Sequence, residues 1–109
     1  MIDILPKLFE YFGLIILFYS NEHDPIHVHG KFQDRESKAE IEIVSGKIIK
    51  IKFKNVMGRR PLQSSKLNDF RTIVKRYSES IVKSWIDFFV LNKPIKSKKI
   101  IKRIKRIQI

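Results

Sequence analysis

The chain has 109 residues, of which 43% are hydrophobic and 11% aromatic, and this composition predicts one folded domain. It has no cysteine, which excludes disulfides and thiolate metal sites, and its longest apolar run, residues 12–19, is far too short for a membrane-spanning helix. Asp3 and Glu10 interrupt the N-terminus and no small-residue cleavage site follows, so we do not expect a signal peptide. The net charge is +12, and residues 93–109 carry eight bases without one acid, which indicates a partner of negative charge for the C-terminal tail.

Four stretches have the patterns that are typical of β-strands. Residues 13–19 form a continuous apolar run, which favours a strand buried on both faces. In residues 26–32 two sets alternate: Ile26, Val28 and Phe32 on one side; His27, His29 and Lys31 on the other. Residues 38–44 and 47–54 also alternate, and Ser45-Gly46 between them is a typical hairpin turn. The sequence therefore predicts an antiparallel meander of about four strands with one apolar face.

Beyond residues 55–63 the hydrophobic period changes from two to that of a helix. Two apolar stripes follow, one over residues 67–77 and one over residues 81–91. Trp85 and Phe88 share the second stripe with Ile81, which predicts that they belong to the core and not to a base-stacking surface. We therefore predict an α+β fold in which residues 1–94 form one domain, with two amphipathic helices packed on one face of the sheet, and residues 95–109 form a basic amphipathic tail.

These residues resemble a known bacterial family. Phe12-Gly13 opens an aliphatic strand, a His-Asp-Pro-Ile-His-Val-His stretch follows at residues 23–29, and Trp85 and Lys93-Pro94 come later. This order is similar to that of the DUF4160 family, a domain of unknown function, over roughly residues 4–99. Ile26 stands where the family often has a second proline. The resemblance implies a small cytoplasmic protein, often encoded beside a second small protein as in a toxin–antitoxin pair.

The three histidines of the chain, His23, His27 and His29, lie within one short segment and are the candidate catalytic residues. On a strand, His27 and His29 share a face with Cα atoms about 6.5–7 Å apart, and His23 can fold back toward them from the turn at residues 20–25. One interpretation is a divalent metal site, with zinc as the typical ion and with His23 or an acid completing the ligands. The acids within reach are Asp24, Glu40 and Glu42.

A second interpretation is acid–base chemistry without a metal. Two imidazoles can take a proton from one oxygen and give one to another, while Lys31, Arg59 or Arg60 binds a phosphate. This is the chemistry of a metal-independent ribonuclease. The third interpretation is structural or recognition only, because histidines beside a proline turn can bond the backbone or line a partner groove.

The tail at residues 95–109 combines bases with isoleucines, whose spacing from Ile100 to Ile107 suits a helix, while Ile107 and Ile109 alone suit a strand. Its candidate partner-binding residues are Lys98, Lys99, Lys102, Arg103, Lys105 and Arg106. Such a segment can bind nucleic-acid phosphates, an acidic protein or an anionic lipid surface. Phosphate binding requires the bases but not an apolar stripe. We therefore rank docking on a partner first, packing on the chain's own body second and nucleic acid third.

The resemblance, the histidines and the positive charge lead to one functional hypothesis and one alternative. The first is the toxin-like half of a toxin–antitoxin module, acting on RNA with a ribonuclease-like activity if the chain is an enzyme. The alternative is a non-catalytic antitoxin or adaptor that recognises a small acidic protein from an adjacent gene.

Overall fold

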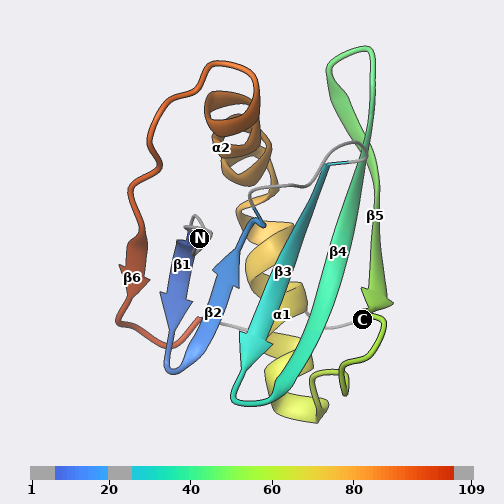
Figure 1. Ribbon diagram of the computed structural model, residues 1–109, viewed down its shortest axis with the longest axis vertical. Coiled ribbons are helices and arrows are strands. Elements are labelled where there is room, and N and C mark those ends of the chain that lie inside the picture. Colours follow the sequence, from blue (N-terminus) through green and yellow to red (C-terminus); the bar gives the residue numbers. More distant parts are fainter. Residues whose placement is uncertain (1–6, 20–25, 105–109) are drawn as a thin grey trace.

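The computed structural model describes residues 7–19 and 26–104. The strands in these residues are β1 (Lys7–Tyr11), β2 (Leu14–Leu17), β3 (Ile26–Phe32), β4 (Arg35–Val44), β5 (Lys47–Asn55) and β6 (Lys98–Ile100). The helices are α1 (Ser64–Arg76) and α2 (Ser78–Phe89). All the strands named form one sheet in the order β5-β4-β3-β2-β1-β6, and both helices lie on the same face of it (Figure 1). The α+β class and the packing of the helices on one face are confirmed.

The predicted number of strands is wrong, because the described residues hold six strands instead of about four. The alternation in β1 is interrupted by a register shift between Lys7 and Phe9, so that Leu8 and Phe9 are both buried and no period of two is visible in the sequence. Strand β6 has three residues inside a basic run and forms by parallel pairing with β1, where Phe9 lies opposite Lys98. Neither strand has a local signal strong enough to predict it.

The strands β3, β4 and β5 form the predicted meander. Val28, Ala39 and Ile41 face the helices and are almost fully buried, whereas His27, His29 and Lys31 face away from them. The predicted hairpin between β4 and β5 is confirmed. Ser45 and Gly46 both have positive φ angles, of 52° and 76°, as a two-residue turn of matching twist requires.

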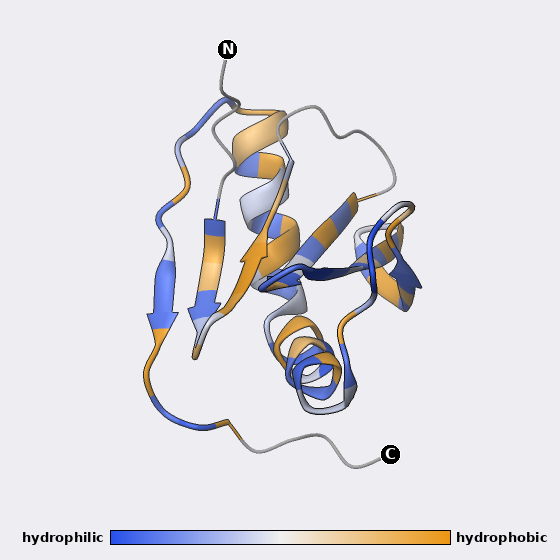
Figure 2. Ribbon diagram, turned by 60° about the horizontal axis from the view of Figure 1, so that its bottom comes forward, coloured by the Kyte–Doolittle hydropathy of each residue, from blue (hydrophilic) through white to orange (hydrophobic). Residues whose placement is uncertain are grey.

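The core lies between the sheet and the helices. Phe70, Ile73 and Val74 of α1 and Ile81 and Trp85 of α2 are buried there, so Trp85 is a core residue as predicted. The same prediction is wrong for Phe88, which is half-buried at the edge of the core and contacts the ring of Phe89 at a centroid distance of 4.9 Å. Strand β2 is hydrophobic along its whole length (Figure 2). The ring of Phe70 lies so close to the sheet that a Cβ atom added to Gly30 would be 2.5 Å from its Cδ1. A glycine at this position of β3 therefore lets α1 approach the strand.

The tail, over its described part, packs on the chain's own body. Its isoleucines Ile95, Ile100 and Ile104 lie against the core. The amide of Ile104 donates a hydrogen bond to the Tyr11 hydroxyl at 3.3 Å. Its bases also contact the body: the Lys98 ammonium is 5.9 Å from the ring centroid of Tyr77, the Arg103 guanidinium is 4.1 Å from that of Phe12, and Lys99 lies 3.8 Å from Glu10. Lys105 and Arg106 lie outside the described residues.

Candidate functional site

The candidate site lies on the face of the sheet opposite the helices, which we call the open face. Cross-strand pairing sets its residues in rows. Ile15 lies beside Lys31 and then Glu36; Leu17 lies beside His29 and then Lys38; His27 lies beside Glu40. Two of the three histidines are thus neighbours on one strand, with apolar side chains on the β2 side and charged side chains on the β4 side.

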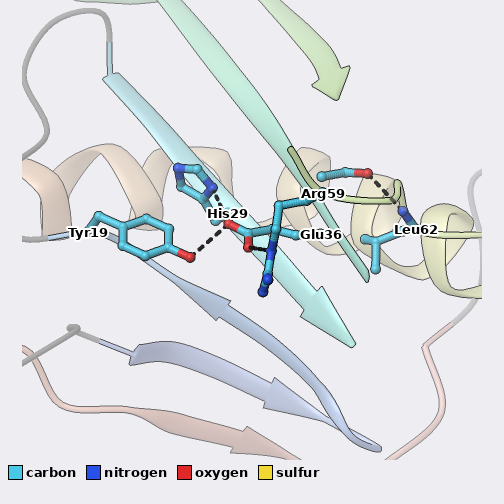
Figure 3. A network of polar contacts seen from close by, with 6 residues as sticks. Tyr19, His29, Glu36, Arg59 and Leu62 are labelled. Carbon is cyan, nitrogen blue, oxygen red and sulfur yellow. Dashed lines mark hydrogen bonds and ion pairs between the residues drawn. The ribbon is translucent and has the colours of Figure 1, made fainter. Parts of the chain in front are cut away.

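A buried carboxylate, that of Glu36, is the centre of the site. Only 2% of this residue is exposed. Its Oε2 accepts a hydrogen bond from the Tyr19 hydroxyl at 2.8 Å and lies 2.8 Å from Nδ1 of His29, while its Oε1 accepts a hydrogen bond from Nε of Arg59 at 3.2 Å. Figure 3 shows the three side chains pointing at this carboxylate from three separate segments. Each of these donors compensates part of the hydration that the carboxylate loses on burial.

Backbone contacts at the start of β4 bring Arg59 to the site. The amide of Glu36 donates to the carbonyl of Arg60 at 2.8 Å, and the amide of Leu62 donates to the Ser37 hydroxyl at 3.1 Å. These two bonds hold the segment between β5 and α1 against the first residues of β4. The Arg59 side chain therefore reaches Glu36 and is still 42% exposed.

The two histidines have different surroundings. His29 is 5% exposed, and its ring also meets the edge of the Tyr19 ring at a centroid distance of 4.5 Å. His27 is half-exposed, and its ring centroid is 5.5 Å from that of His29. Beside His27, the hydrogen bond from the Lys54 ammonium, 2.8 Å from Oε1 of Glu40, is the main cause that lowers the pKa of Glu40.

The contact between His29 and Glu36 selects one tautomer of the imidazole whenever Glu36 is a carboxylate. A carboxylate only accepts hydrogen bonds, so Nδ1 of His29 then carries the proton that points at Glu36. In that tautomer Nε2 is the nitrogen that can accept a further proton. A carboxylate behind a histidine is a common way to orient an imidazole for proton transfer.

The structure brings together some of the predicted site residues and separates others. Lys31 and Arg59 flank Glu36, whereas Arg60 lies in an exposed ion pair with Asp34 at 2.7 Å. His23 and Asp24 lie outside the described residues, so the predicted three-histidine set is described only for His27 and His29. Within residues 7–19 and 26–104, no group of three or more histidines and acids is arranged to hold a metal ion.

Sequence reasoning missed Glu36 and Tyr19. The strand predicted over residues 38–44 begins earlier, at Arg35, so Glu36 belongs to β4. A signal for Glu36 was present, because it continues toward the N-terminus the alternation that places Lys38, Glu40 and Glu42 on the open face. Tyr19 gave no comparable signal, since it ends an apolar run and reads as a core residue.

The fold and the site define a small α+β protein with helices on one face of a sheet and a histidine–carboxylate cluster on the other. The family model described as domain of unknown function (DUF4160) matches residues 13–86. Because the match covers more than half of the chain, this protein belongs to the DUF4160 family. No curated protein and no solved structure matches the chain. No helix in the described part of the chain is long and apolar enough to cross a membrane.

Proposed function

We propose that this chain is the toxin-like half of a two-gene toxin–antitoxin module and that it cleaves RNA on the open face by general acid–base catalysis. One observation carries the proposal. A half-exposed imidazole, that of His27, lies 5.5 Å from the imidazole of His29, which a buried carboxylate orients from a distance of 2.8 Å. The family resemblance adds the toxin–antitoxin setting, and the net charge of +12 favours a polyanionic substrate.

The reaction balances with these two imidazoles alone. One imidazole accepts the proton of a ribose 2′-hydroxyl, and the 2′-oxygen forms a bond to phosphorus. The bond between phosphorus and the 5′-oxygen breaks, and the second imidazole donates a proton to that oxygen. The products are a 2′,3′-cyclic phosphate and a 5′-hydroxyl. Because the nucleophile is the 2′-hydroxyl, DNA is not a substrate.

The other groups of the site have supporting roles. Glu36 holds His29 in one orientation and balances the charge that the ring carries when it is protonated. Arg59 and Lys31 supply positive charge beside the phosphate, on which negative charge develops during the reaction. His27, the more exposed of the pair, is the imidazole that first meets the substrate.

The test compares wild-type protein with His27→Ala and His29→Ala variants in a cleavage assay on single-stranded RNA. We expect each variant to lose about 10²–10⁴-fold in rate, which is the usual contribution of a proton-transferring side chain. Growth inhibition on expression should fall in parallel. Lys50→Ala is the matched control, because Lys50 lies on the same face at the distant strand β5 and should leave the rate unchanged.

Two results support the chemistry and one contradicts it. Products that end in a 2′,3′-cyclic phosphate, and resistance of 2′-O-methyl RNA to cleavage, both point to the 2′-hydroxyl as nucleophile. A His27→Ala, His29→Ala double variant that is folded and still cleaves RNA at the wild-type rate removes the histidines from the reaction.

A second candidate is a non-catalytic protein that binds an acidic partner. It is favoured by a groove of about 640 Å³ between α2 and the end of the β4–β5 hairpin. Apolar side chains line it, those of Ile43, Ile48, Val82 and Ile86, together with Lys47, Lys83 and Glu79. Co-expression with the product of the neighbouring gene distinguishes the two candidates. A stable complex that Val82→Glu abolishes, together with no RNA cleavage, would favour the binding protein.

A further inference from the structure

A hollow of about 410 Å³ lies on the open face, next to the histidines. Six residues from β1, β2, β3 and the adjoining turns line it: Lys7, Gly13, Ile15, Leu17, Lys31 and Gln33. Its position follows from the pairing of β2 with β3, in which Leu17 lies opposite His29 and Ile15 lies opposite Lys31. The hollow therefore lies beside the site proposed for catalysis and shares Lys31 with it, and its volume is within the range of small-molecule pockets.

The floor of the hollow is apolar. Ile15 and Leu17 alternate with Leu14 and Ile16, which face the helices, so β2 presents aliphatic side chains on both of its faces. On the open face neither side chain has a helix above it, because α1 and α2 cover the opposite face (Figure 1). Ile15 is partly exposed there, whereas Leu17 is only 3% exposed and forms the buried edge of the floor. Aliphatic side chains at the bottom of an open hollow favour a ligand with a flat apolar part.

The wall of the hollow carries an ammonium group without a counterion among the described residues. Lys7, Lys52, Lys54 and Lys99 each lie within 4 Å of an acid on this face. Within residues 7–19 and 26–104, Lys31 has neither an ion pair nor a side-chain hydrogen bond. Glu36, the acid beside it in register, already accepts bonds from Tyr19, His29 and Arg59. A half-buried lysine in this position favours an anionic ligand.

We propose that this hollow binds one nucleotide of single-stranded RNA, with the base on Ile15 and a phosphate at the Lys31 ammonium. The inference rests on the proposed function, since it names the part of the substrate that the same face holds. A nucleotide combines a flat, largely apolar base with an anionic group, which matches the floor and the wall. The Gln33 amide at the rim adds a donor and an acceptor for the edge of the base. The chain of the RNA then continues from Lys31 toward His29 and His27 along β3.

The experiment measures binding of a short 2′-O-methyl oligonucleotide, which resists cleavage at the 2′-position. We expect Lys31→Met to weaken binding by about tenfold and to reduce the slope of log affinity against log salt by about 0.7–1, because one phosphate contact is lost. Lys50→Met, which removes a lysine from the same face at β5, should leave affinity and slope within about twofold of wild type. Amide NMR shifts on binding should concentrate in residues 13–17 and 31–33.

These measurements test the nucleotide site and the catalytic proposal independently of each other. If the oligonucleotide binds at residues 13–17 and 31–33 and natural RNA is not cleaved, the nucleotide site stands and the catalytic proposal falls. If Lys31→Met binds like wild type, or if the shifts fall on β5 while residues 13–17 are unaffected, the nucleotide site is overturned whatever the cleavage assay shows. A nucleoside monophosphate that shifts the same amides more than inorganic phosphate does supports the role of the apolar floor.

Discussion

The two faces of the sheet are built from the same strands, β2, β3 and β4, and are held together in different ways. On the helix face, Ile16, Val28 and Ala39 are fully buried and pack against α1 and α2. On the open face, the buried residues include His29 and Glu36, and hydrogen bonds from three segments hold them. Neighbouring residues of one strand therefore point to opposite faces. On one face stability depends on close packing of apolar side chains, and on the other it depends on hydrogen bonds to buried polar groups.

The helix face should be the more sensitive to added volume. Gly30→Ala places a Cβ atom 2.5 Å from Cδ1 of Phe70, and we expect the free energy of unfolding to fall by about 3 kcal/mol, the upper part of the range for overpacking. The melting temperature should fall on the order of 10 °C. In a Phe70→Leu background the same substitution should cost clearly less, because the ring is gone and the two effects are not additive. Equal costs in both backgrounds would show that Phe70 does not limit this position.

The open face should be sensitive to the loss of charge without any change of volume. Glu36→Gln keeps the shape of the side chain but weakens its bonds to Tyr19, His29 and Arg59. We expect a loss of about 2 kcal/mol in the free energy of unfolding, measured by chemical denaturation. The matched control is Glu42→Gln on the same strand, where the acid is partly exposed beside Lys52 at 3.1 Å. This control should change stability by less than about 0.5 kcal/mol, and a similar effect of both substitutions contradicts the central role of Glu36.

A third substitution, Glu40→Gln, should have a small effect that depends on pH. The hydrogen bond from Lys54 lowers the pKa of Glu40 in the folded state below its ordinary value of 4.5. A carboxyl whose pKa is lowered by folding adds stability above the unfolded-state pKa and loses it as the pH falls through the folded-state pKa. Lys54 is half-exposed, so solvent screens the pair and the difference at neutral pH should be about 0.5 kcal/mol.

Denaturation of wild type and Glu40→Gln over a series of pH values checks this prediction. The difference in stability between the two proteins should shrink as the pH drops below 4.5, where the wild-type carboxyl becomes neutral as well. A difference that stays constant over the whole series would mean that Glu40 acts through packing and not through its charge.

Much of the fold was predictable because its signals are local. The alternation in β3, β4 and β5, the Ser45-Gly46 turn and the apolar stripes of both helices each lie within a short window of sequence. The same alternation correctly placed His27 and His29 on the face opposite the helices. The strands β1 and β6 could not be predicted in this way. A register shift interrupts the alternation in β1, and β6 forms only by pairing with β1, which lies at the other end of the chain.

The candidate site was predictable only in part, for a related reason. The histidines are recognisable by residue type, but the acid that orients His29 is defined by contacts with Tyr19 and Arg59, which lie 17 and 23 residues away from it in sequence. Residue type alone could not show which of the many acids is buried. It also could not show that Arg59 and Arg60, adjacent in sequence, bind different carboxylates.

The parallel pairing of β6 with β1 has a consequence for the order of synthesis. Strand β1 lies between β2 and β6, and β6 follows every other strand of the sheet along the chain. While the protein is being made, the meander and both helices leave the ribosome before Lys98–Ile100 does. During that interval one edge of β1 has backbone groups that β6 has not yet covered, and exposed strand edges are places where chains associate wrongly. Pairing with β6 covers this edge of β1 once the tail has been made, and Ile100 and Ile104 pack against the core beside it.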